Sequence, residues 1–197
     1  MGINHSTSDE TSRSGEAAGE PRAWTHDEVV AILEHSAAFL QVAVSGLKND
    51  RLDGQAVADE ATVRDIVAHL AVWEAEFLRE ARLASRRDAA DLGERFDPAS
   101  PVGGCLLSGF GCGDLEWERR HAEQLEKGET GTVFLALEKS QRVLLAFAKD
   151  LSPRALTHHA DWPWGGSSTL AALLVTAAAH KRGHAEEIRS WRTRGCF

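Results

Sequence analysis

The sequence is poor in cysteine and proline. Its three cysteines, Cys105, Cys112 and Cys196, form no C-x-x-C pair. This odd number argues against a disulfide framework, and we interpret the three residues as free thiols. Only five prolines occur, and 43% hydrophobic with 26% charged residues is an ordinary globular composition. A chain of 197 residues is long enough for one buried core and too short for two typical domains.

Long apolar runs and an excess of positive charge are also absent. No stretch approaches the roughly 20 apolar residues that a membrane helix needs, and the N-terminus lacks the features of a secretory signal. We therefore expect a cytoplasmic protein without a membrane segment. The net charge of -8 and the isoelectric point near 5.6 argue against a broad nucleic-acid surface, because phosphate contacts need clustered Lys and Arg.

The first 22 residues differ from the rest of the chain. They contain almost no large apolar side chain and are rich in Ser, Thr, Glu and Gly. Such a segment cannot bury enough apolar surface to offset the entropy that it would lose on ordering. We expect residues 1–22 to be a disordered tail and residues 23–197 to form a single domain.

Apolar residues recur with a helical period in four stretches. These stretches are residues 23–47, 61–83, 132–151 and 167–194. No strand-like alternation of Val, Ile and Thr lies between them, so the sequence predicts an all-α four-helix bundle. The crossover between the second and third helices, from about Arg86 to Glu129, is much longer than a usual helix link. We expect it to border a functional opening.

Two histidines share one face of the last helix. His180 and His184 are four residues apart. They continue an apolar stripe that contains Leu173, Ala177 and Ile188, so both are predicted to face the bundle interior. The H-x-x-x-H spacing alone is a weak indication of a metal site. The alternative is a pair of hydrogen-bonded, partly buried imidazoles.

A third inward histidine is predicted on the second helix. His69 follows Ile66 by three residues and precedes Trp73 by four, on the same apolar stripe. Side chains from facing helices of a bundle can converge on an ion. Three neutral imidazoles that leave open coordination positions suit Zn, Ni, Fe or a related divalent metal. We therefore predict that His69, His180 and His184 bind such a metal, in a catalytic or a structural role.

Charged residues beside these histidines are predicted to lie on the surface. Lys181 lies off the inward stripe of the last helix, and we assign it to the solvated side together with Glu186 and Glu187. Glu74 follows His69 on the second helix. A surface carboxylate is the simpler interpretation of Glu74, and the alternative is an inward carboxylate that hydrogen-bonds a metal ligand or acts as a base.

Two segments of the chain resemble the DinB-like metalloenzyme superfamily. The segment "TVRDIVAHLAVWEAEFL" is similar to its second helix, where a histidine precedes an apolar residue and a tryptophan. The segment "LSPRALTHHADWPWGGSSTLAALLVTAAAHKRGHAEEIRSW" is similar to its second half, which ends with paired histidines and an Ile-Arg-x-Trp sequence. The resemblance covers about residues 24 to 194. It implies a bundle with a long link between helices two and three, and a metal held by His69, His180 and His184 at one end.

The resemblance implies a small-molecule substrate and leaves three functions open. The first is a metal-dependent S-transferase or isomerase that uses a low-molecular-weight thiol (mycothiol, bacillithiol or glutathione) against an electrophile. The second is a resistance or detoxification protein in which a polarised water opens a reactive natural product. Because fold does not decide function, a non-catalytic protein that binds or sequesters a small molecule is the third. A homodimer through outer helix faces is compatible with a bundle.

Several residues are candidates for the lining of the pocket. These residues are Trp73, Trp162 and Trp164, together with His158 and His159 in the loop before the last helix. The tryptophans would supply an aromatic wall, and the alternative is packing in the core and in a lid. The two histidines would line the mouth or carry protons, and the alternative is that both are exposed to solvent.

Overall fold

The computed structural model describes residues 23–54, 56–58, 61–86, 129–162 and 165–194. Four long helices form most of this part and confirm the predicted all-α bundle. They are α1 (His26–Val44), α3 (Val63–Ser85), α5 (Thr130–Asp150) and α6 (Leu170–Thr193). The predicted tail, residues 1–22, lies outside the described residues, and so do residues 87–128 of the predicted crossover.

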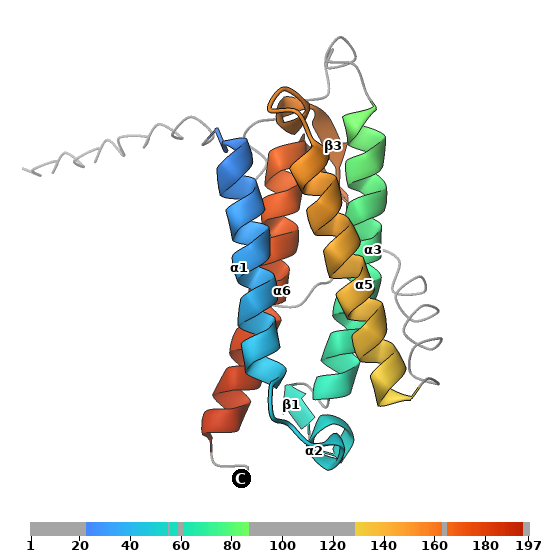
Figure 1. Cartoon of the computed structure of the whole chain (residues 1–197), viewed down its shortest axis with the longest axis vertical. Coiled ribbons are helices and arrows are strands. Elements are labelled where there is room, and N and C mark those ends of the chain that lie inside the picture. Colours follow the sequence, from blue (N-terminus) through green and yellow to red (C-terminus); the bar gives the residue numbers. More distant parts are fainter. Residues whose placement is uncertain (1–22, 55, 59–60, 87–128, 163–164, 195–197) are drawn as a thin grey trace, which may run out of the picture.

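The four helices run in two directions. Helices α1 and α6 run one way, and α3 and α5 run the other way (Figure 1). Helix α1 packs mainly against α6 and α3 mainly against α5, while α3 also packs against α6. Because α3 and α5 point the same way, the end of α3 and the start of α5 lie at opposite ends of the bundle, which agrees with the predicted long crossover. The packing of α3 on α6 joins the two helices that carry the predicted metal ligands.

Short elements that the sequence did not predict lie at the two ends of the bundle (Figure 1). One end has α2 (Asn49–Gly54), β1 (Ala56–Ala58) and β2 (Ala61–Thr62). The other end has the 3-10 helix η2 (Ala155–Thr157), β3 (His159–Asp161) and β4 (Ser167–Thr169). Strands β1 and β2 pair antiparallel, as do β3 and β4. The sequence shows no strand-like alternation at these places, because strands of two or three residues are too short to show it.

The pairing of β4 with β3 determines where α6 begins. The predicted start at residue 167 or 168 was too early, because residues 167–169 are extended and paired. Thr169 is the N-cap, and its hydroxyl oxygen accepts a hydrogen bond from the Ala172 amide at 3.2 Å. The turn before β4 uses Gly165 and Gly166, whose φ angles of 97° and 85° favour glycine. The pairing of β4 with β3 and the Thr169 cap therefore determine the first residue of α6.

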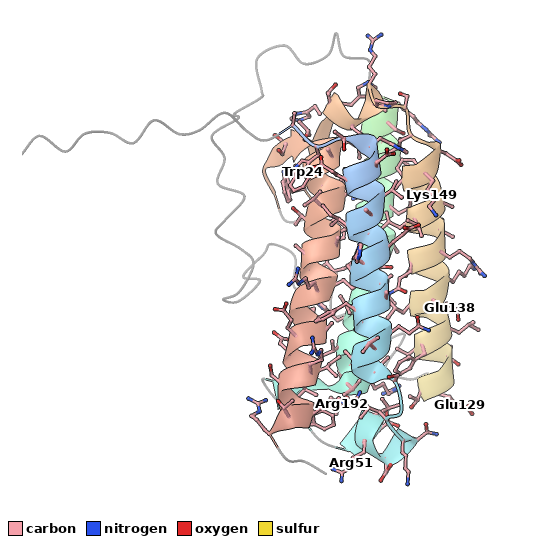
Figure 2. All side chains as sticks on the ribbon, turned by 60° about the vertical axis from the view of Figure 1, so that its left-hand side comes forward. Trp24, Arg51, Glu129, Glu138, Lys149 and Arg192 are labelled. Atoms are coloured by element: carbon pink, nitrogen blue, oxygen red, sulfur yellow. The ribbon has the colours of Figure 1, made fainter. Side chains whose placement is uncertain are left out.

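Helix α6 is also anchored at its far end. Arg192 donates hydrogen bonds to the backbone carbonyls of Ala43, at 2.7 Å, and Ser45, at 3.0 Å, where α1 ends. Figure 2 shows Arg192 beside the end of α1. A cation that satisfies the last carbonyls of a helix also interacts favourably with the helix dipole. Both ends of α6 are thus tied to neighbouring elements.

The buried core consists of two apolar clusters, one above the other along the bundle. One cluster includes Leu33 of α1, Phe77 of α3 and Leu144 of α5, and the other includes Leu40 of α1 and Leu137 of α5. Both clusters also contain residues of α6. Each of the four helices has a polar side chain where the two clusters meet. These side chains are Ser36 of α1, His69 and Glu74 of α3, Ser140 of α5, and His180, Lys181 and His184 of α6. A polar layer therefore crosses the middle of the bundle.

Candidate metal centre

The three predicted ligands converge between α3 and α6. His180 and His184 are one turn apart on α6, and their Nε2 atoms are 3.1 Å from each other. His69 of α3 places its Nε2 atom 3.1 Å from the Nε2 atom of His180. All three nitrogens lie within 4.8 Å of one another. The predicted set is thus brought together at one point.

The histidine cluster is buried on one side and open on the other. His180 is 5% exposed, whereas the side chain of His184 is 20% exposed. The cluster belongs to the polar layer between the two apolar clusters. The expectation that these histidines lie at one end of the bundle was therefore wrong, because His69 and His180 both lie inside long helices.

Hydrogen bonding alone does not account for the arrangement of the three rings. The Nδ1 atom of His184 is 2.7 Å from a carboxylate oxygen of Glu187, which assigns the ring proton of a neutral His184 to Nδ1. Its Nε2 atom then presents a lone pair. The Nε2 atom of His180 lies 3.1 Å from both neighbouring Nε2 atoms, and a single hydrogen cannot serve both contacts well. A cation that accepts all three lone pairs resolves this conflict.

Two of the three separations between the nitrogens fit a small divalent cation. Two imidazole nitrogens bound to one tetrahedral Zn²⁺ at about 2.0–2.1 Å lie about 3.3 Å apart. The two Nε2 contacts of 3.1 Å are close to that separation. The contact between His184 and Glu187 is also the carboxylate–imidazole pair that orients a metal-ligating histidine. The donor types and two of the three separations therefore fit the predicted metal, and the set, which spans up to 4.8 Å, would have to draw together around the ion.

Burial keeps two of the three rings neutral. It lowers the pKa of His69 from 6.5 to about 3, and the nearby His184 lowers it further in the same direction. Burial also lowers the pKa of His180 well below its ordinary value, with added effects from His69, His184 and Lys181. Metal binding requires deprotonated ligands, so these two imidazoles are already in the binding form at neutral pH.

An aromatic wall lies against the histidines. The ring centre of Trp73 is 6.1 Å from that of His69 and 6.0 Å from that of His180. Phe77 lies one turn further along α3, with its ring centre 6.3 Å from that of His180. Trp73 and Phe77 are 4% and 1% exposed. Of the predicted lining residues, Trp73 is thus next to the histidines, and it also packs in the core.

The sequence matches the family model described as the DinB superfamily over residues 31–188. The chain belongs to the DinB superfamily. The matched range contains α3 in full and α6 up to Ile188, and with them the whole histidine cluster. The resemblance found in the sequence is therefore confirmed.

A solved structure has the same fold as this DinB-superfamily chain. YfiT from Bacillus subtilis, described as a probable metal-dependent hydrolase with an unusual four-helix bundle topology, aligns with a TM-score of 0.60 and 18% identity. The alignment covers 94% of this chain and 93% of that chain. No curated protein matches the sequence. Within the described ranges, none of the helices combines the length and apolar character needed to span a bilayer.

The remaining predicted lining residues lie in the segment before α6 or outside the described residues. His158 and His159 are half-buried, which contradicts full solvent exposure. Their nearest polar contacts are the Ala84 carbonyl, 3.3 Å from His158, and the Asp161 carboxylate, 3.1 Å from His159. Trp162 packs as a half-buried side chain against the apolar cluster that contains Phe77. Trp164 lies outside the described residues.

Two charged residues of this DinB-superfamily chain are buried where the sequence predicted a surface. Lys181 and Glu74 are each 2% exposed. The Nζ atom of Lys181 lies 2.5 Å from Oε1 of Glu74, and the hydroxyl of Ser140 donates to Oε2 of Glu74 at 3.0 Å. The assignment of Lys181 to the solvated face and the preference for a surface Glu74 were therefore wrong. Helix α6 packs against both α1 and α3, so its buried face is wider than one stripe.

The spacing of Lys181 and Glu74 from apolar residues of their own helices was the signal of burial that sequence reasoning missed. Lys181 follows Ala177 by four residues and precedes Ala185 by four, and both alanines are buried. Glu74 follows Leu70 by four residues in the same way. Glu187 was correctly placed on the exposed face, but its spacing of three residues after His184 also indicated the hydrogen bond between them.

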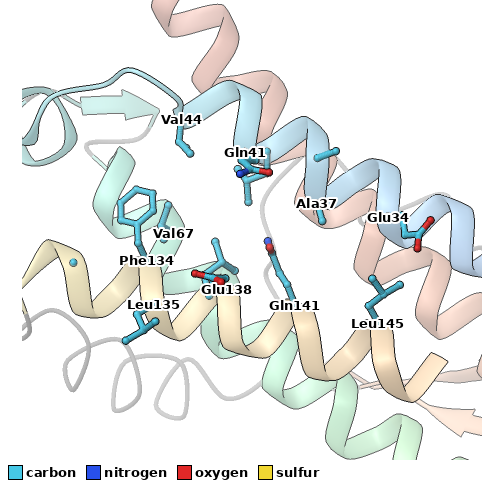
Figure 3. Close-up of a pocket in the computed structure, with 14 residues that line it drawn as sticks. Glu34, Ala37, Gln41, Val44, Val67, Phe134, Leu135, Glu138, Gln141 and Leu145 are labelled. Atoms are coloured by element: carbon cyan, nitrogen blue, oxygen red, sulfur yellow. The ribbon is translucent and has the colours of Figure 1, made fainter. Parts of the chain in front are cut away.

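Two grooves flank α1, and neither is lined by the three histidines. The larger groove, with a volume of about 720 Å³, lies between α1 and α5, and Figure 3 shows Gln41 and Gln141 facing each other across it. The smaller one, of about 570 Å³, lies between α1 and α6. Phe39 lines it, with Arg189 and Arg182 lying over the Phe39 ring. Neither groove therefore contains the histidine cluster, which lies between α3 and α6.

The metal-free protein is expected to lose stability in acid through its buried histidines. The unfolded chain takes up a proton on each imidazole near pH 6.5, whereas folded His69 resists protonation down to about pH 3. The free energy of unfolding should thus be highest above pH 6.5 and fall as pH drops through this window. The expected slope is roughly 1 kcal/mol per pH unit for each such histidine. Urea titrations between pH 4.5 and 7.5 measure it.

The matched comparison is His69→Asn, which removes one of the titrating rings. Its free energy of unfolding should depend less on pH than that of the wild-type protein. An equal pH dependence in the two proteins would contradict the assignment of the effect to the buried cluster.

Proposed function

We propose that the protein is a divalent-metal-dependent enzyme whose metal is held by His69, His180 and His184. The observation that carries this proposal is the convergence of their three Nε2 atoms, which lie within 4.8 Å of one another. Membership of the DinB superfamily agrees with it. Zn²⁺, Ni²⁺ and Fe²⁺ are the ions that suit imidazole donors.

The donor set favours a catalytic role over a structural one. Structural zinc sites are usually closed by four protein ligands, whereas catalytic sites have three and an open position. Three neutral imidazoles would leave the charge of the cation uncompensated, and His184 lies on the accessible side of the cluster. When bound, the cation would supply Lewis acidity that lowers the pKa of a nucleophile.

The chain's own residues would orient the metal ligands and limit the access of water to the cluster. Glu187 holds the His184 ring in one orientation through the 2.7 Å contact at Nδ1. Trp73 and Phe77 are buried beside His180 and exclude water from that side of the cluster. A small electrophile would meet the nucleophile at the open side of the cluster, beside His184.

The first candidate for the nucleophile is a low-molecular-weight thiol, in an S-transferase or isomerase reaction. The sulfur would form a bond to an electrophilic carbon while the C=C π bond of an α,β-unsaturated ketone or a C–O bond of an epoxide breaks. A proton equivalent to the one lost by the thiol would end on the α-carbon or on the oxygen of the substrate. A soft thiolate suits the borderline-soft metals that imidazoles bind. The low pKa values of His69 and His180 make these rings ligands and not proton acceptors.

Water is the second candidate for the nucleophile, in a hydrolytic reaction. YfiT, which has the same fold, is described as a probable metal-dependent hydrolase. The same three histidines would serve that reaction, so the two candidates differ in the cosubstrate and not in the metal ligands. Hydrolytic opening of a reactive natural product, as in a resistance protein, belongs to this second class.

Metal titration tests the ligand set. The wild-type protein should bind one divalent ion per chain, and His69→Ala, His180→Ala and His184→Ala should each bind it more than about 100-fold more weakly. His35→Ala is the matched control, because His35 is exposed and hydrogen-bonds within α1. Competition with a chromophoric chelator measures the dissociation constants. Wild-type protein that stays metal-free in the presence of Zn²⁺, Ni²⁺ and Fe²⁺ would contradict the proposal.

Glu187 should contribute to metal affinity through His184. Glu187→Gln weakens the acceptor for the His184 Nδ1 proton, so we expect the metal to bind about 10–100-fold more weakly. Glu186→Gln is the control, because the neighbouring Glu186 pairs with Arg182 at 2.9 Å. Equal affinities for the two variants in the same titration would exclude this role of Glu187.

The nucleophile is identified by comparing reactions with and without a thiol. The metal-loaded protein is incubated with an α,β-unsaturated ketone or an epoxide, in the presence and absence of glutathione, mycothiol or bacillithiol. We expect a thiol adduct that forms only with metal and disappears in His180→Ala, as detected by mass spectrometry. Hydrolysed substrate without thiol would favour the second candidate. Substrate binding without turnover, unchanged in His69→Ala, would instead indicate a sequestering protein.

A further inference from the structure

A buried ion pair lies in the same polar layer as the histidines. It joins Glu74 of α3 to Lys181 of α6, with Oε1 and Nζ 2.5 Å apart and each side chain 3% exposed. Ser140 of α5 completes the group by donating its hydroxyl to the other carboxylate oxygen at 3.0 Å. Three of the four helices therefore meet at one buried charge pair.

Stability does not explain why the core contains these charges. Moving two charges out of water is unfavourable, and apolar residues of similar volume often replace a buried pair with no loss of stability. Apolar side chains also tolerate several relative positions of two helices, whereas a charge pair is satisfied in only one. Buried polar groups are known to fix register in this way in coiled coils. The pair between Glu74 and Lys181 thus favours a single alignment of α3 on α6.

That alignment is the one on which the histidine cluster depends. Lys181 directly follows His180 in α6, and Glu74 lies five residues after His69 in α3. A slip of one helical turn moves α3 by about 5.4 Å relative to α6. Such a slip would abolish the 3.1 Å approach of His69 to His180. The apolar clusters on both sides consist of hydrophobic side chains, whose packing is less specific for one register.

We propose that Glu74, Lys181 and Ser140 are positioning residues that fix the register of α3 on α6 and thereby hold His69 against His180 and His184. The functional consequence of this inference rests on the proposed metal centre. The positioning itself does not, because it concerns the distance between two helices in the metal-free protein. An experiment can therefore contradict the positioning role without contradicting the proposed metal centre, and the reverse.

The central variant replaces the pair with apolar residues of similar size, Glu74→Leu with Lys181→Met. A matched control replaces a second inter-helix pair in the same way, Glu34→Leu with Lys149→Met. The Lys149 and Glu34 pair joins α5 to α1 at 2.7 Å, but its side chains are half exposed. Both double variants remove one positive and one negative charge, so the net charge of each variant is unchanged.

Three measurements are made on each protein: the urea midpoint of unfolding, the metal dissociation constant, and proton NMR cross-relaxation between the His69 and His180 rings. The ring centres of His69 and His180 are 5.0 Å apart, which is close enough for a cross peak in the metal-free protein. We expect the core double variant to keep at least the wild-type midpoint and yet bind metal about 10–100-fold more weakly. Its cross peak should be lost or weakened, and the surface double variant should match the wild type in both binding and NMR.

A stable core double variant with wild-type metal affinity and an unchanged cross peak would overturn the proposal. If the wild-type protein binds no metal, the proposed function fails, and the cross peak alone decides the positioning role. If the core double variant does not fold, Glu74→Gln with Lys181→Met takes its place. This variant keeps a hydrogen-bond acceptor for Ser140 and removes both charges. The results that would support or contradict the proposal are the same for this variant as for Glu74→Leu with Lys181→Met.

Discussion

The polar layer between two apolar clusters imposes the strongest constraint on this bundle. Buried polar groups must find partners, because each one left without a partner costs about 1–3 kcal/mol. At this level α3 and α6 contribute a carboxylate, an ammonium group and three imidazoles. The carboxylate and the ammonium group satisfy each other. The imidazoles point their Nε2 atoms at one another, an arrangement that neutral rings satisfy poorly and a cation satisfies well.

Much of the fold and the members of the histidine cluster could be predicted because their signals are local. Capping residues and apolar periods locate the four helices, and the inward stripes place His69, His180 and His184 on facing surfaces. The ion pair was missed because a charge was taken to indicate solvent, although Lys181 lies between buried positions. The height of the site along the bundle and the two strand pairs depend on how distant segments pack, which short sequence patterns do not encode.

Membership of the DinB superfamily and the fold shared with YfiT do not select a reaction. The side chains around the cluster set limits on its chemistry. Two of the rings are kept neutral by burial, an aromatic wall covers one side, and His184 faces the accessible side. These features suit the proposed role, in which a bound metal activates a nucleophile at the open side of the cluster. The nucleophile itself is determined by the cosubstrate and not by these residues.

Anomalous diffraction tests the central claim most directly. A crystal grown with Zn²⁺ or Ni²⁺ is measured just above and just below the absorption edge of the metal. The account predicts one strong peak between α3 and α6, about 2.0–2.2 Å from the Nε2 atoms of His69, His180 and His184. Ordered histidine rings without such a peak, or a peak held by other residues, would contradict it.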